Sequence, residues 1–250
     1  MSFPKLKNKY LFEALFSPDE FVSYKNWDKA NFPSKIIITY QKTAVNHFRK
    51  MFAGDYRTIR LTGYHKLLVY KNIGFIKLDG IGSPHAATAF EELISMGGRT
   101  FINMGSAGGL TARGVFLCNK AVRDEGTSHH YIKDSLYSYP DKELTNRLKQ
   151  SLEKFKLSFK TAPTWTIDAP YRETKKEISH YRKLGIATVE MEASALFAVA
   201  KLRNVKLAAV FVVSDLLAKD AWVPEFHKFN YKKALTKVLD AAVACLLAED

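Results

Sequence analysis

The sequence predicts an α/β fold: a single domain with a mixed central β-sheet flanked by helices on both faces. Apolar runs of strand length alternate along the chain with segments of helical period, which is the pattern of an α/β domain. The runs at 35–40 (KIIITY) and 206–213 (KLAAVFVV) are almost uniformly apolar, as strands covered on both faces are. With 250 residues and 47% hydrophobic content, the chain is expected to fold as one domain over residues 1–250.

Regular elements are predicted along most of the chain. Strands are expected at 35–40, 100–105 and 206–215, and helices at 42–52, within 79–98, at 141–156 and from Glu192 onward. The segment 66–78 predicts a hairpin that turns at Lys71-Asn72. Pro84 suits the first turn of its helix, Gly97-Gly98 ends that helix, and Asp141 is an expected helix cap. The last helix carries one apolar stripe, Leu235, Val238, Leu239, Ala242 and Leu246.

Three stretches predict loops, at 106–110 (SAGGL), 120–140 and 161–174 (TAPTWTIDAPYRET). The first consists of small residues and follows an expected strand. The third combines two prolines with a cluster of aromatic and polar side chains. This composition favours an ordered functional loop over a linker.

The formal charge of +13 admits nucleic acid, a membrane surface or small anions as partners. Lysine and arginine are scattered rather than gathered into one block, so no specific nucleic-acid partner is expected. Neither a membrane-spanning apolar run nor an apolar leader is found. We therefore expect a cytoplasmic location and no membrane partner. Cys118 and Cys245 lack metal-ligand spacing, which favours reduced structural thiols and no metal.

Candidate ligand-binding residues follow three strand ends, where α/β sheets bind their ligands. The stretches are 78–84 (LDGIGSP), 102–109 (INMGSAGG) and 210–215 (VFVVSD). The glycine stretches match neither the dinucleotide fingerprint nor the P-loop, so they are either simple turns or places where backbone N–H groups approach an anion. Asp215, at the end of a buried strand, is either a helix cap or an acid.

Glu190 and Glu192 flank Met191 directly before an apolar helix. The helix dipole favours negative charge at this end, so capping accounts for one of the two glutamates. A carboxylate held there can accept two hydrogen bonds from a vicinal diol, as acidic residues do for ribose in nucleotide sites. The pair is therefore a candidate sugar-binding site.

Four stretches, "GIGSPHAATAFEEL", "RTFINMGSAGG", "VEMEASAL" and "VVSD", resemble the nucleoside phosphorylase-I family in their order and spacing. The resemblance covers residues 35–220. That family includes purine nucleoside phosphorylase, uridine phosphorylase and the methylthioadenosine nucleosidases, so the resemblance implies a phosphorylase/hydrolase-like fold. It also implies that Glu192 binds the ribose hydroxyls, Met191 packs on the sugar and Glu190 shapes that wall. Asp215 would protonate the ring nitrogen of a departing purine, a step that general acid catalysis suits.

The resemblance further implies where phosphate, the co-substrate, would bind. Gly105 and Ser106 would contact it, Gly82 would line the same pocket, and Arg60 would reach it across a dimer interface. Asn103 stands where phosphorylases of the family carry an arginine, as it does in the nucleosidase branch, which uses water instead. The water-activating glutamate of the nucleosidases has no counterpart either, because the stretch 41–45 (QKTAV) contains no carboxylate.

The segment 161–174 reaches over the base in this family. The base-binding residues expected from the resemblance are Trp165, Thr166, Asp168, Tyr171 and Arg172, and a purely structural corner is the alternative. Arg172, or Arg123 near another strand end, is a candidate to replace the missing arginine. The aspartate after V-S favours purines, whereas "GIGSP…AFEEL" is closer to uridine phosphorylases.

The expected function is that of a nucleoside phosphorylase, which converts a purine or uridine nucleoside reversibly to free base and ribose 1-phosphate. Phosphate is the co-substrate, and no metal or organic cofactor is expected. The alternatives are a nucleosidase, which uses water, and a non-catalytic nucleoside-binding descendant. The interface implied by Arg60 predicts a homodimer or a trimer of dimers.

Overall fold

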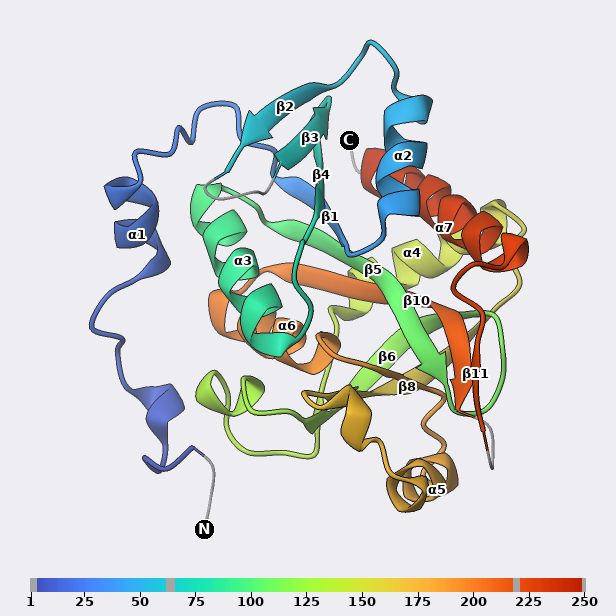
Figure 1. Ribbon diagram of the computed structural model, residues 1–250. Helices are drawn as coiled ribbons and strands as arrows, with labels where there is room; N and C mark the ends of the chain where they lie inside the picture. Colours follow the sequence, from blue (N-terminus) through green and yellow to red (C-terminus); the bar gives the residue numbers. More distant parts are fainter. Residues whose placement is uncertain (1–3, 62–65, 218–220, 249–250) are drawn as a thin grey trace.

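A large β-sheet forms the centre of the protein in a computed structural model that describes residues 4–61, 66–217 and 221–248 (Figure 1). Its strands are β1 Lys35–Thr39, β2 Arg57–Arg60, β3 Lys66–Tyr70, β4 Ile73–Lys77, β5 Thr100–Gly109, β6 Val115–Asp124, β7 Tyr137–Ser138, β8 Phe159–Ile167, β9 Thr188–Glu190, β10 Lys206–Leu217 and β11 Trp222–Pro224. The α-helices are α1 Pro18–Tyr24, α2 Lys42–Met51, α3 Ser83–Met96, α4 Lys142–Lys154, α5 Lys175–Lys183, α6 Ala193–Arg203 and α7 Phe229–Leu247. Short 3₁₀ turns are η1 Lys9–Leu11, η2 Ser128–His130 and η3 Pro170–Arg172.

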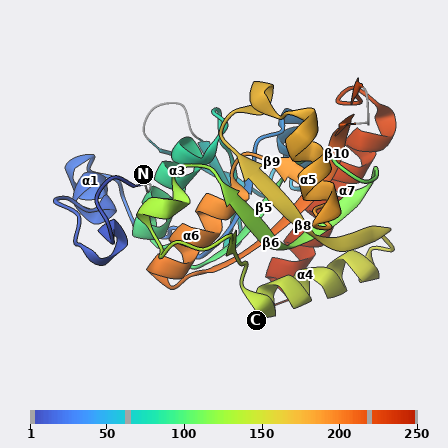
Figure 2. The same ribbon diagram turned by 90° about the horizontal axis from the view of Figure 1, so that it is seen from below.

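Five of the strands pair in a closed ring. β5 is parallel to β10, β10 antiparallel to β6, β6 parallel to β8, β8 parallel to β9, and β9 antiparallel to β5. β1 pairs with the first half of β5 on the edge opposite β10 and leads through β4 and β3 to β2. Seen from below, β5, β6, β8 and β9 lie close together (Figure 2). The ring brings the ends of β5, β8, β9 and β10 to one place.

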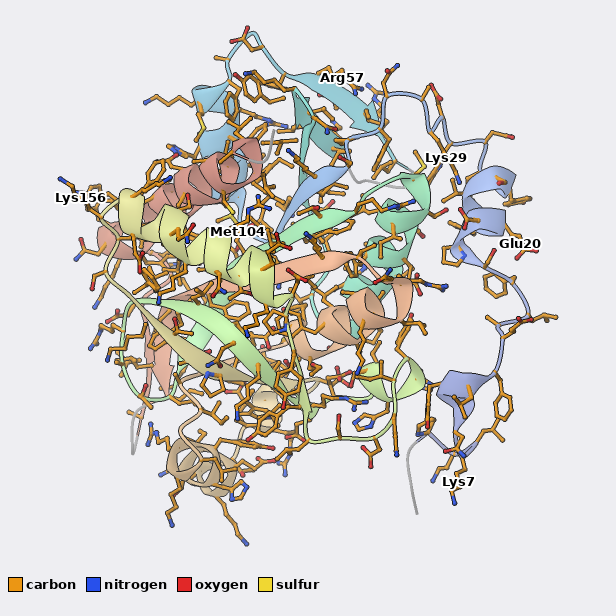
Figure 3. The ribbon with its side chains drawn as sticks, turned by 180° about the vertical axis from the view of Figure 1, so that it is seen from behind. Lys7, Glu20, Lys29, Arg57, Met104 and Lys156 are labelled. Atoms are coloured by element: carbon orange, nitrogen blue, oxygen red, sulfur yellow. The ribbon has the colours of Figure 1, made fainter. Side chains whose placement is uncertain are left out.

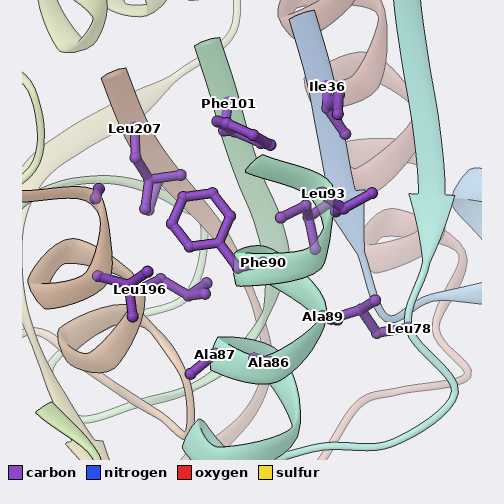
Figure 4. Packing of buried hydrophobic residues seen from close by; sticks show 14 of the residues in the cluster. Ile36, Leu78, Ala86, Ala87, Ala89, Phe90, Leu93, Phe101, Leu196 and Leu207 are labelled. Atoms are coloured by element: carbon purple, nitrogen blue, oxygen red, sulfur yellow. The ribbon is translucent and has the colours of Figure 1, made fainter. Parts of the chain in front are cut away.

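Helices cover both faces of the sheet, which confirms the expected α/β fold class. On one face, α3 and α6 pack on β1, β5 and β10 through residues such as Phe90, Phe101 and Leu196 (Figure 4). On the other face, α2, α4 and α7 cover the sheet, and α4 and α7 lie side by side over Met104 (Figure 3). The predicted stripe of the last helix is fully buried against this face, as Leu235, Val238, Leu239, Ala242 and Leu246.

Several local predictions are confirmed. β3 and β4 form the predicted hairpin, and Lys71 in its turn has a φ of 51°. α3 begins directly after Gly82, whose φ of 94° favours glycine, and Pro84 lies in its first turn. Asp141 caps α4, because its carboxylate accepts a hydrogen bond of 2.7 Å from the backbone N–H of Leu144.

The predicted loop at 106–110 is wrong, because β5 continues as a strand to Gly109. The small residues permit close strand packing. A Cβ atom on Gly109 would lie 2.7 Å from the carbonyl oxygen of Ala112 and 2.8 Å from a Leu216 methyl carbon, and one on Gly108 would lie 3.0 Å from Val189. These glycines let β5 pair with β9 and β10 at once and so close the ring.

The other two predicted loops are also partly strands. β6 runs to Asp124, and β8 covers 159–167 before the chain turns at η3. Pro163 in isolation predicts a loop. It lies opposite an irregularity in β6, where pairing jumps from Cys118–Ala162 to Ala121–Thr164, so its missing N–H disturbs no regular ladder.

Cys118 and Cys245 are buried, and neither forms a disulfide, as the sequence predicts. Burial raises the pKa of Cys118 far above its ordinary range. No helix in the described parts of the chain has both the length and the apolar character needed to cross a membrane.

The α4 cap gives a prediction about stability. Replacing Asp141 with alanine is expected to lower the free energy of unfolding by about 1 kcal/mol, because the Leu144 N–H loses its acceptor. Chemical denaturation measures the change. Glu153→Ala, an exposed site on the same helix, is the matched control and should change it by less than about 0.5 kcal/mol. Equal effects of the two substitutions would contradict the capping role.

Candidate active site

Glu190, at the end of β9, organises the start of α6. One of its carboxylate oxygens accepts hydrogen bonds from the backbone N–H groups of Glu192 (2.8 Å) and Ala193 (2.7 Å). The other accepts a bond of 2.5 Å from the Thr166 hydroxyl, and the Thr166 oxygen accepts from the Ser194 N–H at 3.0 Å. Glu190 thus caps α6 and joins it to β8.

Glu192 points to a second helix start. Its Oε1 accepts a hydrogen bond of 2.6 Å from the backbone N–H of Gly82, which precedes α3. The Ser83 hydroxyl donates to the Met191 carbonyl at 2.7 Å, and the Met191 methyl lies near Gly82. The starts of α3 and α6 are therefore bonded together, with Glu192 between them and the partly exposed Met191 alongside.

Burial raises the pKa of both glutamates, and the charge of Glu192 raises that of Glu190 further. The two carboxylates form one closely coupled pair. Tyr40, the residue after β1, lies near this pair. Burial, reinforced by the two carboxylates, raises the pKa of its phenol well above the ordinary value, so the hydroxyl keeps its proton.

Asp215 lies on β10, with an exposed fraction of 9%. The Ser214 hydroxyl bonds its Oδ1 at 2.7 Å, and the Trp222 indole N–H donates to its Oδ2 at 2.8 Å. Burial raises the pKa of Glu173, which follows η3, to about 7, and the nearby charge of Asp215 contributes. Asp215 is thus a buried carboxylate that accepts from one hydroxyl and one N–H group and has the acidic Glu173 as a neighbour.

Gly108 connects Asp215 with the glutamates. It pairs with Asp215 on one side and with Val189 on the other, and Glu190 directly follows Val189. A Cβ atom on Gly108 would lie 3.5 Å from Oδ2 of Asp215. The predicted acid and the predicted sugar-binding pair therefore lie at the same end of the strand ring.

The residues expected to bind phosphate are only partly brought together. Gly105 and Ser106 lie on β5 in the strand ring, and Gly82 lies beside Glu192. Asn103 is fully buried on β5, and neither of its side-chain polar atoms has a hydrogen-bond partner among the described residues. Arg60 ends β2, where it is exposed and separated from β1 by β3 and β4. Within this chain, Arg60 does not reach the site.

The expected base-binding residues separate into two groups. Trp165 and Thr166 are fully buried on β8, where the indole packs in a core cluster and donates to Asp124 at 2.9 Å, while Thr166 supports Glu190. Asp168 is exposed and accepts from the Gly126 N–H at 2.8 Å. Tyr171 and Arg172 are exposed on η3. Trp165 is therefore a core residue rather than part of a base pocket.

Arg123, the other candidate to replace the missing phosphate-binding arginine, is hydrogen-bonded to a different part of the chain. Arg123 is buried, and its guanidinium donates to the Ser128 hydroxyl at 2.8 Å, to the Lys133 carbonyl at 2.8 Å and to the Ser135 hydroxyl at 2.9 Å. It holds the 128–135 segment in place and is not directed to Ser106.

Five residues around the site lie outside the four sequence motifs: Tyr40, Gln41, Glu173, Trp222 and Tyr231. Gln41 donates to the Ser106 hydroxyl at 3.0 Å, and Tyr231 also hydrogen-bonds Ser106. Tyr40 ends a predicted strand and Gln41 follows it, which is a detectable signal because ligands bind at strand ends. Trp222 and Tyr231 reach the site only through the tertiary fold.

The sequence pattern of the phosphorylase superfamily matches residues 35–247, and the chain belongs to this superfamily. This confirms the resemblance of the four motifs. A guanosine phosphorylase of Halorubrum lacusprofundi is 29% identical over 177 residues, which are 66% of this chain and 73% of that protein. A purine nucleoside phosphorylase of Plasmodium vivax is 30% identical over 64% of this chain and 65% of its own length, and a uridine phosphorylase of Treponema pallidum is 29% identical over 68% and 72%.

Solved structures share the fold. An AMP nucleosidase from Bacteroides thetaiotaomicron superposes with a TM-score of 0.76 at 19% identity, covering 94% of this chain and all (100%) of that one. A uridine phosphorylase from Vibrio fischeri gives 0.73 at 24% identity, covering 88% and 92%. The sequence relatives are named nucleoside phosphorylases, and this chain belongs to the same superfamily of enzymes.

The two glutamates should respond differently to substitution. Glu190→Gln is expected to lower the free energy of unfolding by about 2 kcal/mol, because an amide cannot accept all three hydrogen bonds that Glu190 accepts. Glu192→Gln should fold stably but bind nucleoside at least roughly tenfold more weakly. Denaturation and calorimetric titration measure the two effects. A stable Glu190→Gln protein would contradict the capping role.

The raised pKa values also predict how stability varies with pH. A carboxyl whose pKa is raised on folding binds more protons in the folded than in the unfolded state, so stability falls as the pH rises above the ordinary value of 4.5. The unfolding free energy should therefore decrease between about pH 5 and about pH 8, and Glu192→Gln should flatten this decrease. Denaturation curves across this range measure it, and an equal slope in both proteins would count against a buried charged pair.

Proposed function

We propose that the protein cleaves the N-glycosidic bond of a purine nucleoside, with Glu192 binding the ribose hydroxyls and Asp215 protonating the departing base. The observation that carries this proposal is the placement of Glu192 and Asp215 at one end of the strand ring, joined through Gly108 and β9. The Glu192 carboxylate has backbone hydrogen bonds with Gly82 and Met191, and a carboxylate has further acceptor positions that suit a sugar diol.

Asp215 fits the acid role by its position and partners. Cleavage passes through an oxocarbenium-like state in which negative charge develops on the base, and a proton delivered there stabilises it. The Ser214 hydroxyl donates to Oδ1 and the Trp222 indole N–H donates to Oδ2, so both oxygens of Asp215 are held by hydrogen-bond donors. A base that approaches Oδ2 must first displace Trp222.

A place for the base lies beside Asp215. A hollow of about 510 Å³ next to β11 is lined by Trp222, Pro224, Glu225, Phe226, His227 and Lys228. Its aromatic side chains offer the apolar surface on which a purine ring packs. An aspartate acid favours purines over uridine, because a purine ring nitrogen takes the proton.

Phosphorolysis and hydrolysis share these roles for Glu192 and Asp215 and differ in the group that attacks the anomeric carbon. The names of the relatives support phosphate as co-substrate. Assembly as a homodimer or a trimer of dimers belongs to the same proposal, because exposed Arg60 could contact phosphate only in another subunit.

Substitution of Asp215 tests the acid. Asp215→Asn is expected to lower turnover of inosine and adenosine by about a hundredfold or more, because the amide cannot supply the proton. Base release followed by ultraviolet absorbance measures it, and circular dichroism confirms the fold. Glu143→Gln, a surface carboxylate bound to Lys206, is the control and should leave turnover unchanged. Turnover like that of the unmodified protein in Asp215→Asn would remove Asp215 as the acid.

A further inference from the structure

We infer that the protein has a second small-molecule site, a groove between α2 and the β3–β4 hairpin that binds a small phosphate-bearing anion. The groove is a hollow of about 190 Å³ where α2 packs on β4 (Figure 1). Its lining residues are Lys42, Val45, Asn46, Arg49, Lys66, Leu68, Phe75, Lys77 and Asp79. None of them belongs to the four family motifs or takes part in the proposed cleavage.

The α2 side of the groove is one stripe of the helix. Counted from Lys42, the four lining residues of α2 are spaced at i, i+3, i+4 and i+7, which places them on one helix face. Lys42 and Arg49 are exposed at the two ends of this stripe, and Val45 is partly buried between them. The stripe therefore presents a cation at each end of an apolar centre.

The hairpin side supplies an apolar floor and two further cations. Leu68 and Phe75 are paired across β3 and β4, and both are buried in the core cluster that also contains residues of α2. Lys66 and Lys77 each lie two residues from this pair, so their side chains leave the same face of the hairpin. Because the strands are antiparallel, both lysines stand at the same end of the floor.

The groove carries an excess of positive charge. One acid, Asp79, lines it together with four cations, Lys42, Arg49, Lys66 and Lys77. The Lys77 ammonium group is bonded to the Asp79 carboxylate at 2.5 Å. Lys42, Arg49 and Lys66 form no ion pair with a described residue. Three uncompensated cations around one hollow repel one another, and a bound anion relieves this repulsion.

The lining groups indicate the class of ligand. Arginine and lysine bind phosphate through charge-assisted hydrogen bonds, which are stronger than those between neutral groups. The Asn46 amide has donors and an acceptor for hydroxyl groups, and Leu68 and Phe75 offer apolar contact to carbon atoms. Sites for drug-sized ligands measure ~300–1,000 Å³. The smaller hollow of about 190 Å³ therefore suits a phosphate ion or a small sugar phosphate.

The groove is distinct from the proposed active site. Neither Glu192 nor Asp215 lines it, and it carries cations where the active site carries carboxylates. Arg60 pairs with Lys66 across β2 and β3 but does not line the hollow, so the groove is complete within one chain. The inference therefore does not depend on the proposed cleavage.

Calorimetric titration of the full-length protein with ribose 5-phosphate, inorganic phosphate and ribose tests the groove. We expect ribose 5-phosphate to bind and ribose not to bind. The double variant Arg49→Gln/Lys66→Gln should bind ribose 5-phosphate at least roughly tenfold more weakly, because two charge-assisted contacts are lost. Inorganic phosphate that binds at least as tightly as the ester would identify the ion as the ligand. Tighter binding of the ester would identify a sugar phosphate.

The matched control removes the same charge outside the groove. Lys50 of α2 and Lys71 of the hairpin turn are exposed and do not line the hollow, so Lys50→Gln/Lys71→Gln should bind like the unmodified protein. Equal loss in the two double variants would show a general effect of charge and overturn the inference. Undiminished binding in Arg49→Gln/Lys66→Gln would place the ligand elsewhere, the active site included, and would also overturn it.

The absence of binding by the unmodified protein would overturn the inference as well. Circular dichroism confirms the fold of each variant. Base release from nucleosides, measured in parallel, reports separately on the proposed function. It is expected to stay unchanged in both double variants, because neither changes a residue of the proposed active site.

Discussion

The carboxylate of Glu190 is the constraint on which the rest of the site depends. It accepts the first N–H groups of α6 and the hydroxyl of Thr166, so it fixes the angle between β9, β8 and the helix. Because Glu192 is only two residues further on, this capping directs its side chain to Gly82. A buried carboxylate that accepts several hydrogen bonds thus serves the fold, and its neighbour is left for the ligand.

Strand packing provides the second constraint. The ring requires β5 to pair with β9 and β10 at its end, and Gly108 and Gly109 allow this because larger residues would collide with Val189, Ala112 or Leu216. The pairing of Gly108 brings Asp215 to the same end as the glutamates. Asp215, the proposed acid, and Glu192, the proposed sugar-binding residue, thus lie at the same end of the ring. Gly82 bonds Glu192 there, although it lies far from both residues in the sequence.

The fold class, the covered strands and the α7 stripe are predictable from the sequence, because hydrophobic periodicity determines them. Local motifs predict Glu192 and Asp215 as site residues, and the fold places both at one end of the strand ring. Prediction from the sequence fails at 106–110 and 161–174, where glycine and proline are loop signals in isolation. Their roles in β5 and β8 depend on neighbouring strands, which no local pattern records. The family resemblance implies a base-binding role for Trp165, with a structural corner as the alternative, and its complete burial depends on the folded core rather than on the motif.

The charge of the protein and the charge of its site have opposite signs. The chain carries a formal charge of +13, while Glu173, Glu190, Glu192 and Asp215 gather around one strand end. Burial raises the pKa of Glu173 and of the glutamate pair, since the site does not solvate their charges well. These buried carboxyl groups therefore hold their protons more tightly than exposed ones do. Most of the scattered lysines and arginines lie on the solvated surface of the protein. The chemistry of the site follows instead from its carboxylates and neutral donors.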